Sequence, residues 1–380
     1  MRTNKVMNAA VAAAFVLFAT TAAAPLPRPV GLEVKAGPNA AYATRHDGIR
    51  LSVPEPSDHS SGGSPSVAPS LTDLYVTIPS AEGGERLLRV ESTGHLWDER
   101  ASSRIVLSRK QAARMRSEAE RLRKAHYGRL TDWKEAKRML PRRSVFSITD
   151  VESGLTFRVQ RRAGSDHADV QPLTKEDTRI MRRIYKDGWS WRRKAIIVGS
   201  EDRRLAASMN GMPHGGDGIP GNGFSGHFCV HFLNSSTHRS VNPDPEHQLM
   251  VYKAAGRLRE MLDGSSPLAQ ARYLAAAMDQ NETEIVRLMT EGMPLPESAG
   301  LVAATAKFAS FRAGKIAESK RDPVTELTAV VDLDAVFQSR GKPSRRETVR
   351  LSFARLSPLS PWRLDDCEFI PVRSRSSRRS

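Results

Sequence analysis

The stretch GMPHGGDGIPGNGFSGHFCVHFL, from Gly211 to Leu233, decides how the middle of the chain folds. Seven of its first sixteen residues are glycines, and an apolar run from Phe228 to Leu233 follows. Side chains alternate between the two faces of a strand, so a strand here separates two sets of residues. The sets are His227, Cys229 and His231 on one face, and Phe228, Val230 and Phe232 on the other. We predict a core strand entered through a glycine-rich loop.

Cys229 is a candidate nucleophile because histidines lie on both sides of it in the sequence. A buried thiol is usually inert, and it reacts when an imidazole accepts its proton. His214 lies in the glycine-rich loop, fifteen residues before Cys229, and the glycines let the backbone approach a substrate closely. We expect His214 to act as the general base.

The same residues resemble the catalytic motif of the L,D-transpeptidases of bacterial cell walls. That family has a His-Gly pair, a glycine-rich loop and Ser-His-Gly-Cys with the nucleophile, and this chain has His214-Gly215, a similar loop and Gly226-His227-Phe228-Cys229. Phe228 stands where the family has Gly, the serine is displaced to Ser225, and His231 stands near the family's usual Arg or Asn. The match covers residues 206–234.

The resemblance implies that Cys229 attacks a peptide carbonyl in a wall stem peptide after His214 takes its proton, with His227 as the third residue of the motif. Backbone N–H groups would hold the oxyanion. The residues expected to contact substrate are Arg162, Ser225, Gly226 and His231, with Arg162 chosen because it belongs to one of several arginine pairs that can bind carboxylates. The alternative is a non-catalytic wall-binding or scaffold protein in which Cys229 is a small core residue.

A zinc-dependent wall peptidase is a further alternative, although the preferred interpretation needs no cofactor. His167 and Asp169 share one face of an extended segment, and His214 and His227 would complete a ligand set. Either of two more histidines, His231 or His238, would also fit.

The N-terminus predicts export. Arg2 and Lys5 precede an apolar stretch from Ala9 to Ala19 and then small residues, which is the pattern of a secretory signal. The formal charge is +16, so the surface should attract anionic wall polymers or peptidoglycan. Export and an aromatic content of 6% argue against nucleic acid as a partner, and no later stretch is apolar enough to span a membrane. We expect a secreted, extracellular or wall-associated protein.

The remaining patterns predict an α+β fold, with a β-rich central domain and flanking helices, and a C-terminal α+β domain with a curved antiparallel sheet. The expected parts are a signal peptide (1–23), a flexible Pro/Gly/Ser-rich tether (24–70), a small β element (71–107), the central Cys/His domain (108–264), the C-terminal module (265–372) and a basic tail (373–380). The expected helices are 108–128, 131–140, 174–188, 244–262, 267–278 and 282–289. Their expected N-terminal caps are Ser108 with Gln111, Thr131, Thr174 with Asp177, and Asp244 before Pro245. The expected strands are 71–78, 85–91, 144–149, 155–160, 194–198, 204–209, 228–233, 326–337, 347–354 and 362–372.

Two resemblances accompany this division. Residues 108–264 look like a domain of exported proteins of spore-forming bacteria, one with no established activity. The C-terminal module weakly resembles the cone-shaped fold of nuclear transport factor two, which implies binding or spacing and no chemistry. The chain has two cysteines, Cys229 and Cys367, and a disulfide between them would remove the nucleophile.

Overall fold

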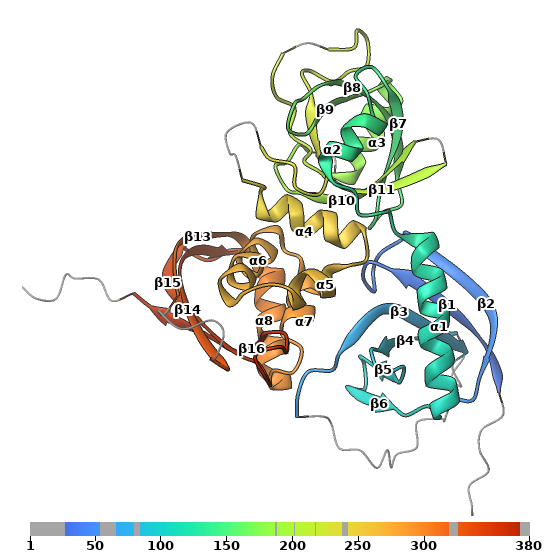
Figure 1. Cartoon of the computed structure of the whole chain (residues 1–380), viewed down its shortest axis with the longest axis vertical. Coiled ribbons are helices and arrows are strands. Elements are labelled where there is room, and N and C mark those ends of the chain that lie inside the picture. The colour runs from blue at the N-terminus through green and yellow to red at the C-terminus, as the bar shows by residue number, and fades with distance from the viewer. Residues whose placement is uncertain are drawn as a thin grey trace, which may run out of the picture.

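The computed structural model describes residues 27–53, 66–79, 84–186, 188–200, 202–216, 218–237, 242–318 and 326–372. Within these ranges the fold is α+β, as predicted, with two open antiparallel sheets, a closed six-stranded barrel and helices between them (Figure 1). The expected signal peptide, the basic tail and His238 lie outside the described residues.

The N-terminal module is a six-stranded sheet covered by one long helix. Its strands are β1 (Arg28–Lys35), β2 (Ala43–Leu51), β3 (Leu71–Pro79), β4 (Glu85–Glu91), β5 (Leu96–Asp98) and β6 (Ser103–Ile105), in the order β2-β1-β3-β4-β5-β6. Helix α1 (Arg109–His126) begins at Ser108, whose side chain forms the predicted capping box with Gln111. Its apolar stripe, Met115, Ala119 and Leu122, packs into the core of this sheet.

The prediction of a tether over residues 24–70 is wrong for residues 28–51. These residues form β1 and β2, and Val30, Leu32 and Val34 alternate into the core of the sheet. The alternation is short and is surrounded by proline, glycine and charged residues, so the composition concealed it.

The boundary at residue 108 is also wrong, because α1 packs on the N-terminal sheet and not on the central domain. The chain passes to the barrel at Gly128, where a Cβ atom would lie 2.5 Å from the backbone nitrogen of Ala206. This close approach lets Arg129 pair with the barrel backbone at Arg204 and Ala206. The central domain therefore starts near residue 128.

The central domain is a closed barrel of order β10-β11-β12-β9-β8-β7. The strands are β7 (Val145–Asp150), β8 (Thr156–Ala163), β9 (Ala168–Pro172), β10 (Lys194–Ser200), β11 (Arg203–Met209) and β12 (Phe228–His231). Alternate apolar side chains from all six strands fill its interior, as the sequence pattern predicted for 144–160 and 194–209.

Two helices accompany the barrel, α2 (Trp133–Met139) and α3 (Lys175–Ile184). The predicted cap of α3, Thr174 with Asp177, is confirmed. The predicted cap of α2 is wrong by one residue: Asp132 accepts the N–H of Lys134, whereas the Thr131 hydroxyl donates to the carbonyl of Arg129.

The helix expected over 244–262 is broken into α4 (Pro245–Ala254) and α5 (Leu258–Asp263). The break is at Gly256, which has a φ of +65° and leaves room for the ring of Tyr127. Helix α4 packs on β10 and β11 on one side and on α6 (Pro267–Gln280) on the other, so no sharp domain boundary exists at residue 264.

The C-terminal module packs three helices against one face of a curved four-stranded antiparallel sheet (Figure 1). After α6 come α7 (Thr283–Met289) and α8 (Leu295–Lys307), and the strands are β13 (Phe308–Glu318), β14 (Thr328–Ser339), β15 (Arg345–Ala354) and β16 (Arg363–Pro371). The pattern did not predict α8 or β13, whereas the other strands and helices of the module are confirmed.

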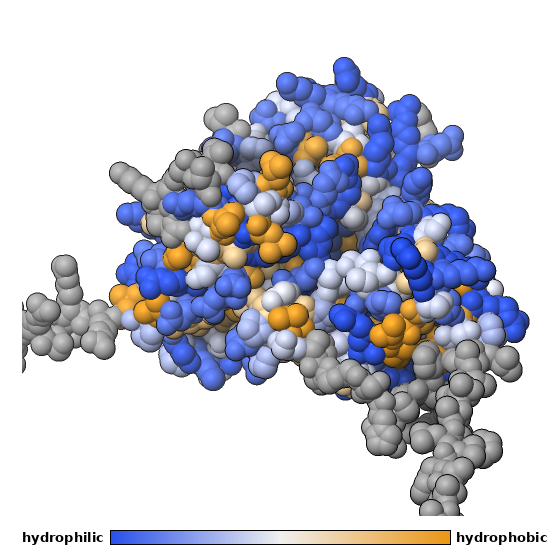
Figure 2. All heavy atoms as spheres, turned by 60° about the horizontal axis from the view of Figure 1, so that its bottom comes forward, coloured by the Kyte–Doolittle hydropathy of each residue, from blue (hydrophilic) through white to orange (hydrophobic). Residues whose placement is uncertain are grey.

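The face of the molecule in Figure 2 is largely hydrophilic. On the face in Figure 2, hydrophobic side chains gather in small patches that polar and charged side chains surround. No helix among the described residues is both long and apolar enough to cross a bilayer.

Candidate active site

The candidate site lies on the outer face of the barrel, where α4 covers β11 and β12 (Figure 1). The predicted alternation along β12 is confirmed: Phe228 and Val230 belong to the barrel core, and Cys229 and His231 lie on the opposite face. In the register of β12 with β9, Cys229 is opposite Asp169. The sheet therefore brings together two residues that are sixty positions apart.

His214 lies beside Cys229, with its Nε2 atom 3.2 Å from the Cys229 Sγ atom. The His214 Nδ1 atom is 2.8 Å from the carbonyl oxygen of Met212, which can only accept a hydrogen bond. In the neutral ring the proton is therefore on Nδ1, and Nε2 presents a lone pair to the thiol. This is the tautomer that a general base for Cys229 requires.

Two glycines hold His214 in place. His214 and His227 exchange two backbone hydrogen bonds, of 3.0 and 2.8 Å. Gly226 has a φ of +81°, and a Cβ atom there would lie 2.4 Å from the carbonyl oxygen of His214; a Cβ on Gly215, at a φ of +70°, would meet the ring of His227. The glycine-rich loop folds back on β12 only because these positions lack side chains.

Asp169 is a buried carboxylate among the histidines. Its Oδ1 atom lies 3.0 Å from Nε2 of His167, 3.8 Å from Nε2 of His227 and 4.0 Å from Sγ of Cys229. The alternative ligand set proposed from the sequence, His167, Asp169, His214 and His227, is thus gathered around Cys229.

The Cys229 thiol is protonated at rest. Burial raises its pKa far above the usual range, the nearby carboxylate of Asp169 raises it further, and the side chain of Asn210 acts in the opposite direction. A preformed thiolate is therefore not favoured, and the proton must pass to a base as the sulfur attacks.

Two more histidines stack behind the thiol. The rings of His231 and His247, the latter from α4, are 3.7 Å apart, and the ring of His167 lies 4.5 Å from that of His231. Burial lowers the pKa of His231 and of His247 well below the usual range, so both rings are neutral. They are buried, and His231 does not line an open substrate groove as the resemblance implied.

The other expected contact residues are placed differently. Ser225 is exposed in the loop, and Gly226 supports His214 through backbone packing. Arg162 donates to Gln160 on its own strand, β8, which is not adjacent to β12 in the barrel. The strand order of the barrel therefore does not place Arg162 beside Cys229.

Sequence reasoning did not place several further residues at this site. Trp191 is half exposed and its ring lies 5.2 Å from that of His214, so it forms a wall beside the base. Met212 contributes its carbonyl, Asn210 its side-chain amide and His247 a ring contact. Among these three, only His247 carried a signal in the sequence, as a histidine in the first turn of a helix.

Both cysteines are free, with Cys229 in the barrel and Cys367 in β16 of the C-terminal sheet. The disulfide that would have removed the nucleophile is not formed. Cys229 therefore has the free thiol that the expected chemistry requires.

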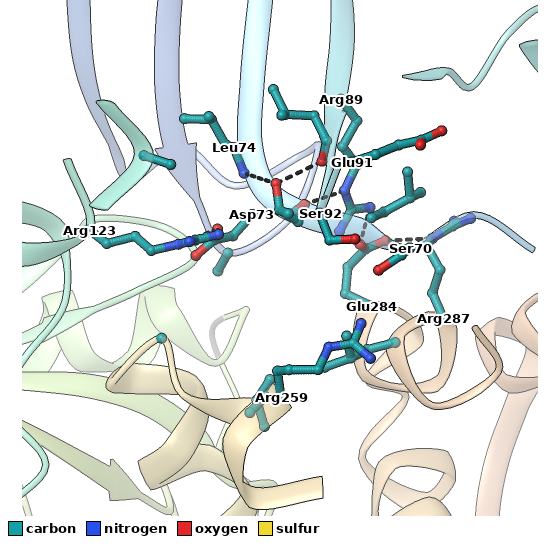
Figure 3. A pocket seen from close by; sticks show the side chains of 18 of the residues that line it. Ser70, Asp73, Leu74, Arg89, Glu91, Ser92, Arg123, Arg259, Glu284 and Arg287 are labelled. Carbon is teal, nitrogen blue, oxygen red and sulfur yellow. Dashed lines mark hydrogen bonds and ion pairs between the residues drawn. The ribbon is translucent and has the colours of Figure 1, made fainter. Parts of the chain in front are cut away.

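A separate cavity of about 400 Å³ lies between the N-terminal sheet, α1, α5 and α7 (Figure 3). Its floor is apolar, and charged pairs surround it: Arg123 binds Asp73, and Arg287 lies 3.4 Å from Glu284. Cys229 does not line it, so this cavity and the thiol site are distinct features.

Comparisons with known proteins give no assignment. No family model matches the chain, and no curated protein or solved structure was found to be similar to it.

Proposed function

We propose that this protein is an exported, wall-associated cysteine acyltransferase of the L,D-transpeptidase type, acting on peptidoglycan stem peptides. The observation that carries the proposal is the pairing of a buried thiol with the unprotonated nitrogen of His214, 3.2 Å away. The strongly basic composition supports an anionic wall as its surroundings.

The reaction follows from this pairing. The Sγ proton moves to Nε2 of His214 as the sulfur forms a bond to the carbonyl carbon of the substrate. The tetrahedral oxyanion collapses, the C–N bond breaks, and the protonated His214 gives its proton to the leaving amine. A second amine, or water, then attacks the thioester and releases Cys229.

The burial of the thiol sets the order of events. Because burial and Asp169 both raise the pKa of Cys229, sulfur attack and proton transfer to His214 occur together. His214 must therefore be present during acylation, and it cannot be replaced by a higher pH in the ordinary range.

The test is intact-mass spectrometry after incubation with a tetrapeptide stem fragment. We expect an adduct of one acyl group on Cys229, absent in Cys229→Ala and formed about 100- to 10,000-fold more slowly in His214→Ala. Cys367→Ala is the matched control, because it removes the other free thiol and should acylate normally. An adduct or product that persists in Cys229→Ala would refute the proposal.

A non-catalytic wall-binding protein is the second candidate, favoured by the 4% exposure of Cys229. It predicts that the protein sediments with insoluble peptidoglycan, that Cys229→Ala sediments equally well, and that wild type forms no acyl adduct. The same two samples therefore separate the candidates.

A further inference from the structure

His167, Cys229 and His231 form a compact set of metal-binding side chains. Their ligand atoms lie within 4.8 Å of one another, and all three residues are buried. They come from β12 and from the residue that precedes β9, so the barrel itself fixes their positions. This set differs from the one expected from the sequence, because it contains the thiol.

The outward nitrogen of each imidazole is held by a neighbouring acceptor. The Nδ1 atom of His231 lies 3.1 Å from the Ser235 hydroxyl oxygen, and that hydroxyl donates its own proton to the carbonyl of Phe232. The hydroxyl therefore accepts from His231, which places the proton on Nδ1 and the lone pair on Nε2.

His167 is held in the same way. Its Nδ1 atom lies 2.9 Å from the carbonyl oxygen of Ser236, and its Nε2 atom points toward Asp169 Oδ1 at 3.0 Å. A histidine whose Nδ1–H is bonded to an outer oxygen while Nε2 faces inward is the usual arrangement around a protein-bound metal. The adjacent residues Ser235 and Ser236 supply both outer contacts.

We propose that His167, Cys229 and His231, with Asp169 as the fourth ligand, bind a zinc-like divalent cation that reversibly inactivates the thiol. Binding replaces two protons, the one on Sγ and the one shared in the 3.0 Å contact between His167 Nε2 and Asp169 Oδ1, and both leave to solvent. The freed lone pairs of the sulfur, the imidazole nitrogen and the carboxylate then bind the metal. The inhibitory part rests on the proposed acyltransferase function, whereas the binding part does not.

The charges and distances suit such a cation. A thiolate and a carboxylate with two neutral imidazoles balance a charge of +2, and nitrogen and sulfur ligands favour zinc over magnesium or calcium. A tetrahedral zinc site separates its ligand atoms by about 3.3–3.8 Å. Asp169 lies 3.0 Å from His167 and 4.0 Å from Cys229, close to these values. The ligand atoms of His167, Cys229 and His231, which lie within 4.8 Å of one another, must draw closer by up to about 1 Å.

The test titrates metal-free full-length protein with Co²⁺ as a visible substitute for Zn²⁺. We expect one equivalent to bind, with a thiolate-to-cobalt charge-transfer band that Zn²⁺ abolishes. Cys229→Ser should lose the band, and Ser235→Ala, which keeps all four ligands but frees His231, should weaken binding about 10- to 100-fold. His46→Gln, at a half-exposed histidine of the N-terminal sheet, is the control.

Circular dichroism checks that each variant is folded. If Cys229→Ser does not fold, the Co²⁺ affinity of Ser235→Ala still tests the site. A band that survives in folded Cys229→Ser, or Co²⁺ binding that His46→Gln weakens as much as Ser235→Ala, would overturn the proposal. So would the failure of wild type to bind Co²⁺.

Activity measurements on the same samples separate this inference from the function. Zinc that binds without any acylation in metal-free protein would leave the metal site standing and refute the acyltransferase. Acylation that one equivalent of zinc does not suppress would leave the acyltransferase standing and refute inhibition by the metal. Activity that requires zinc and is lost with a chelator would overturn the inhibitory role, because the metal would then be catalytic.

Discussion

The orientation of His214 depends on its two neighbours, Met212 and Cys229. The Met212 carbonyl holds Nδ1 of His214, and the opposite nitrogen faces the thiol. The sequence indicated His214 and Cys229 as the proposed base and nucleophile, because a histidine in a glycine-rich loop and a cysteine flanked by histidines are both visible in it. It could not indicate the carbonyl that selects the tautomer, since every residue has one.

Gly226→Ala tests whether the loop backbone positions the base. The added Cβ would lie 2.4 Å from the His214 carbonyl oxygen, at a φ of +81°, so we expect His214 to be displaced and stability to fall by about 1–3 kcal/mol. Urea unfolding and the acylation rate measure the two effects.

Gly216→Ala is the control for that change, because its Cβ would point into open space and its φ is not positive. It should keep both stability and acylation close to wild type. Equal effects of the two substitutions would mean that Gly226 has no special role in placing His214.

Helix α4 links the thiol site to the rest of the molecule. His247 from its first turn stacks on His231, and the neighbouring Glu246 lies 3.0 Å from Arg193, which also binds Asp244. The cap Asp244 and the following proline predicted where α4 begins. The break at Gly256 was not predictable, because it depends on the ring of Tyr127 from the end of α1.

Glu246 gives stability a pH dependence. Burial raises its pKa to about 7; Arg193 opposes the shift, and Asp244 and Asp279 add to it. The folded protein thus prefers protonated Glu246, so its stabilising contribution is complete below about pH 4.5 and is lost as pH rises through about 7.

The prediction is that wild type loses on the order of 2–3 kcal/mol of unfolding free energy between pH 5 and 8 through this group, and that Glu246→Gln removes that part of the loss. Urea midpoints for both proteins across this range measure it. Parallel curves for the two proteins would show that Glu246 titrates normally.

The barrel and the C-terminal module share buried ionic contacts and a continuous core. Lys253 of α4 lies 2.7 Å from Glu152, in the turn between β7 and β8, and 2.5 Å from Glu282, just before α7. Barrel residues such as Ile197 and Ala206 belong to the same core as α6 and β14. The sequence predicted separate modules because composition changes near residue 264, but composition carries no information on which surfaces meet.

Lys253→Met should therefore destabilise the barrel and the C-terminal module together. It leaves the carboxylate of Glu282 buried without its cation, which costs about 3–5 kcal/mol. A single cooperative thermal transition that moves to lower temperature is expected. The double change Lys253→Met with Glu282→Gln should recover part of the loss, and the absence of recovery would contradict this account.

Strands with clear alternation, such as β7, β8 and β14, and helices with capping boxes were predictable from local sequence. Barrel closure was not, because β12 joins β9 and β11 across long segments and pairs through only two or three residues on each side. The resemblance of the C-terminal module to the nuclear transport factor two fold stays a prediction.

The proposed acyl transfer is tested by the mass of the protein after incubation with a tetrapeptide stem fragment in metal-free buffer. We expect one acyl group on Cys229, formed rapidly by wild type and Cys367→Ala and slowly by His214→Ala. An unmodified Cys229 under these conditions, or product formed by Cys229→Ala, would contradict it.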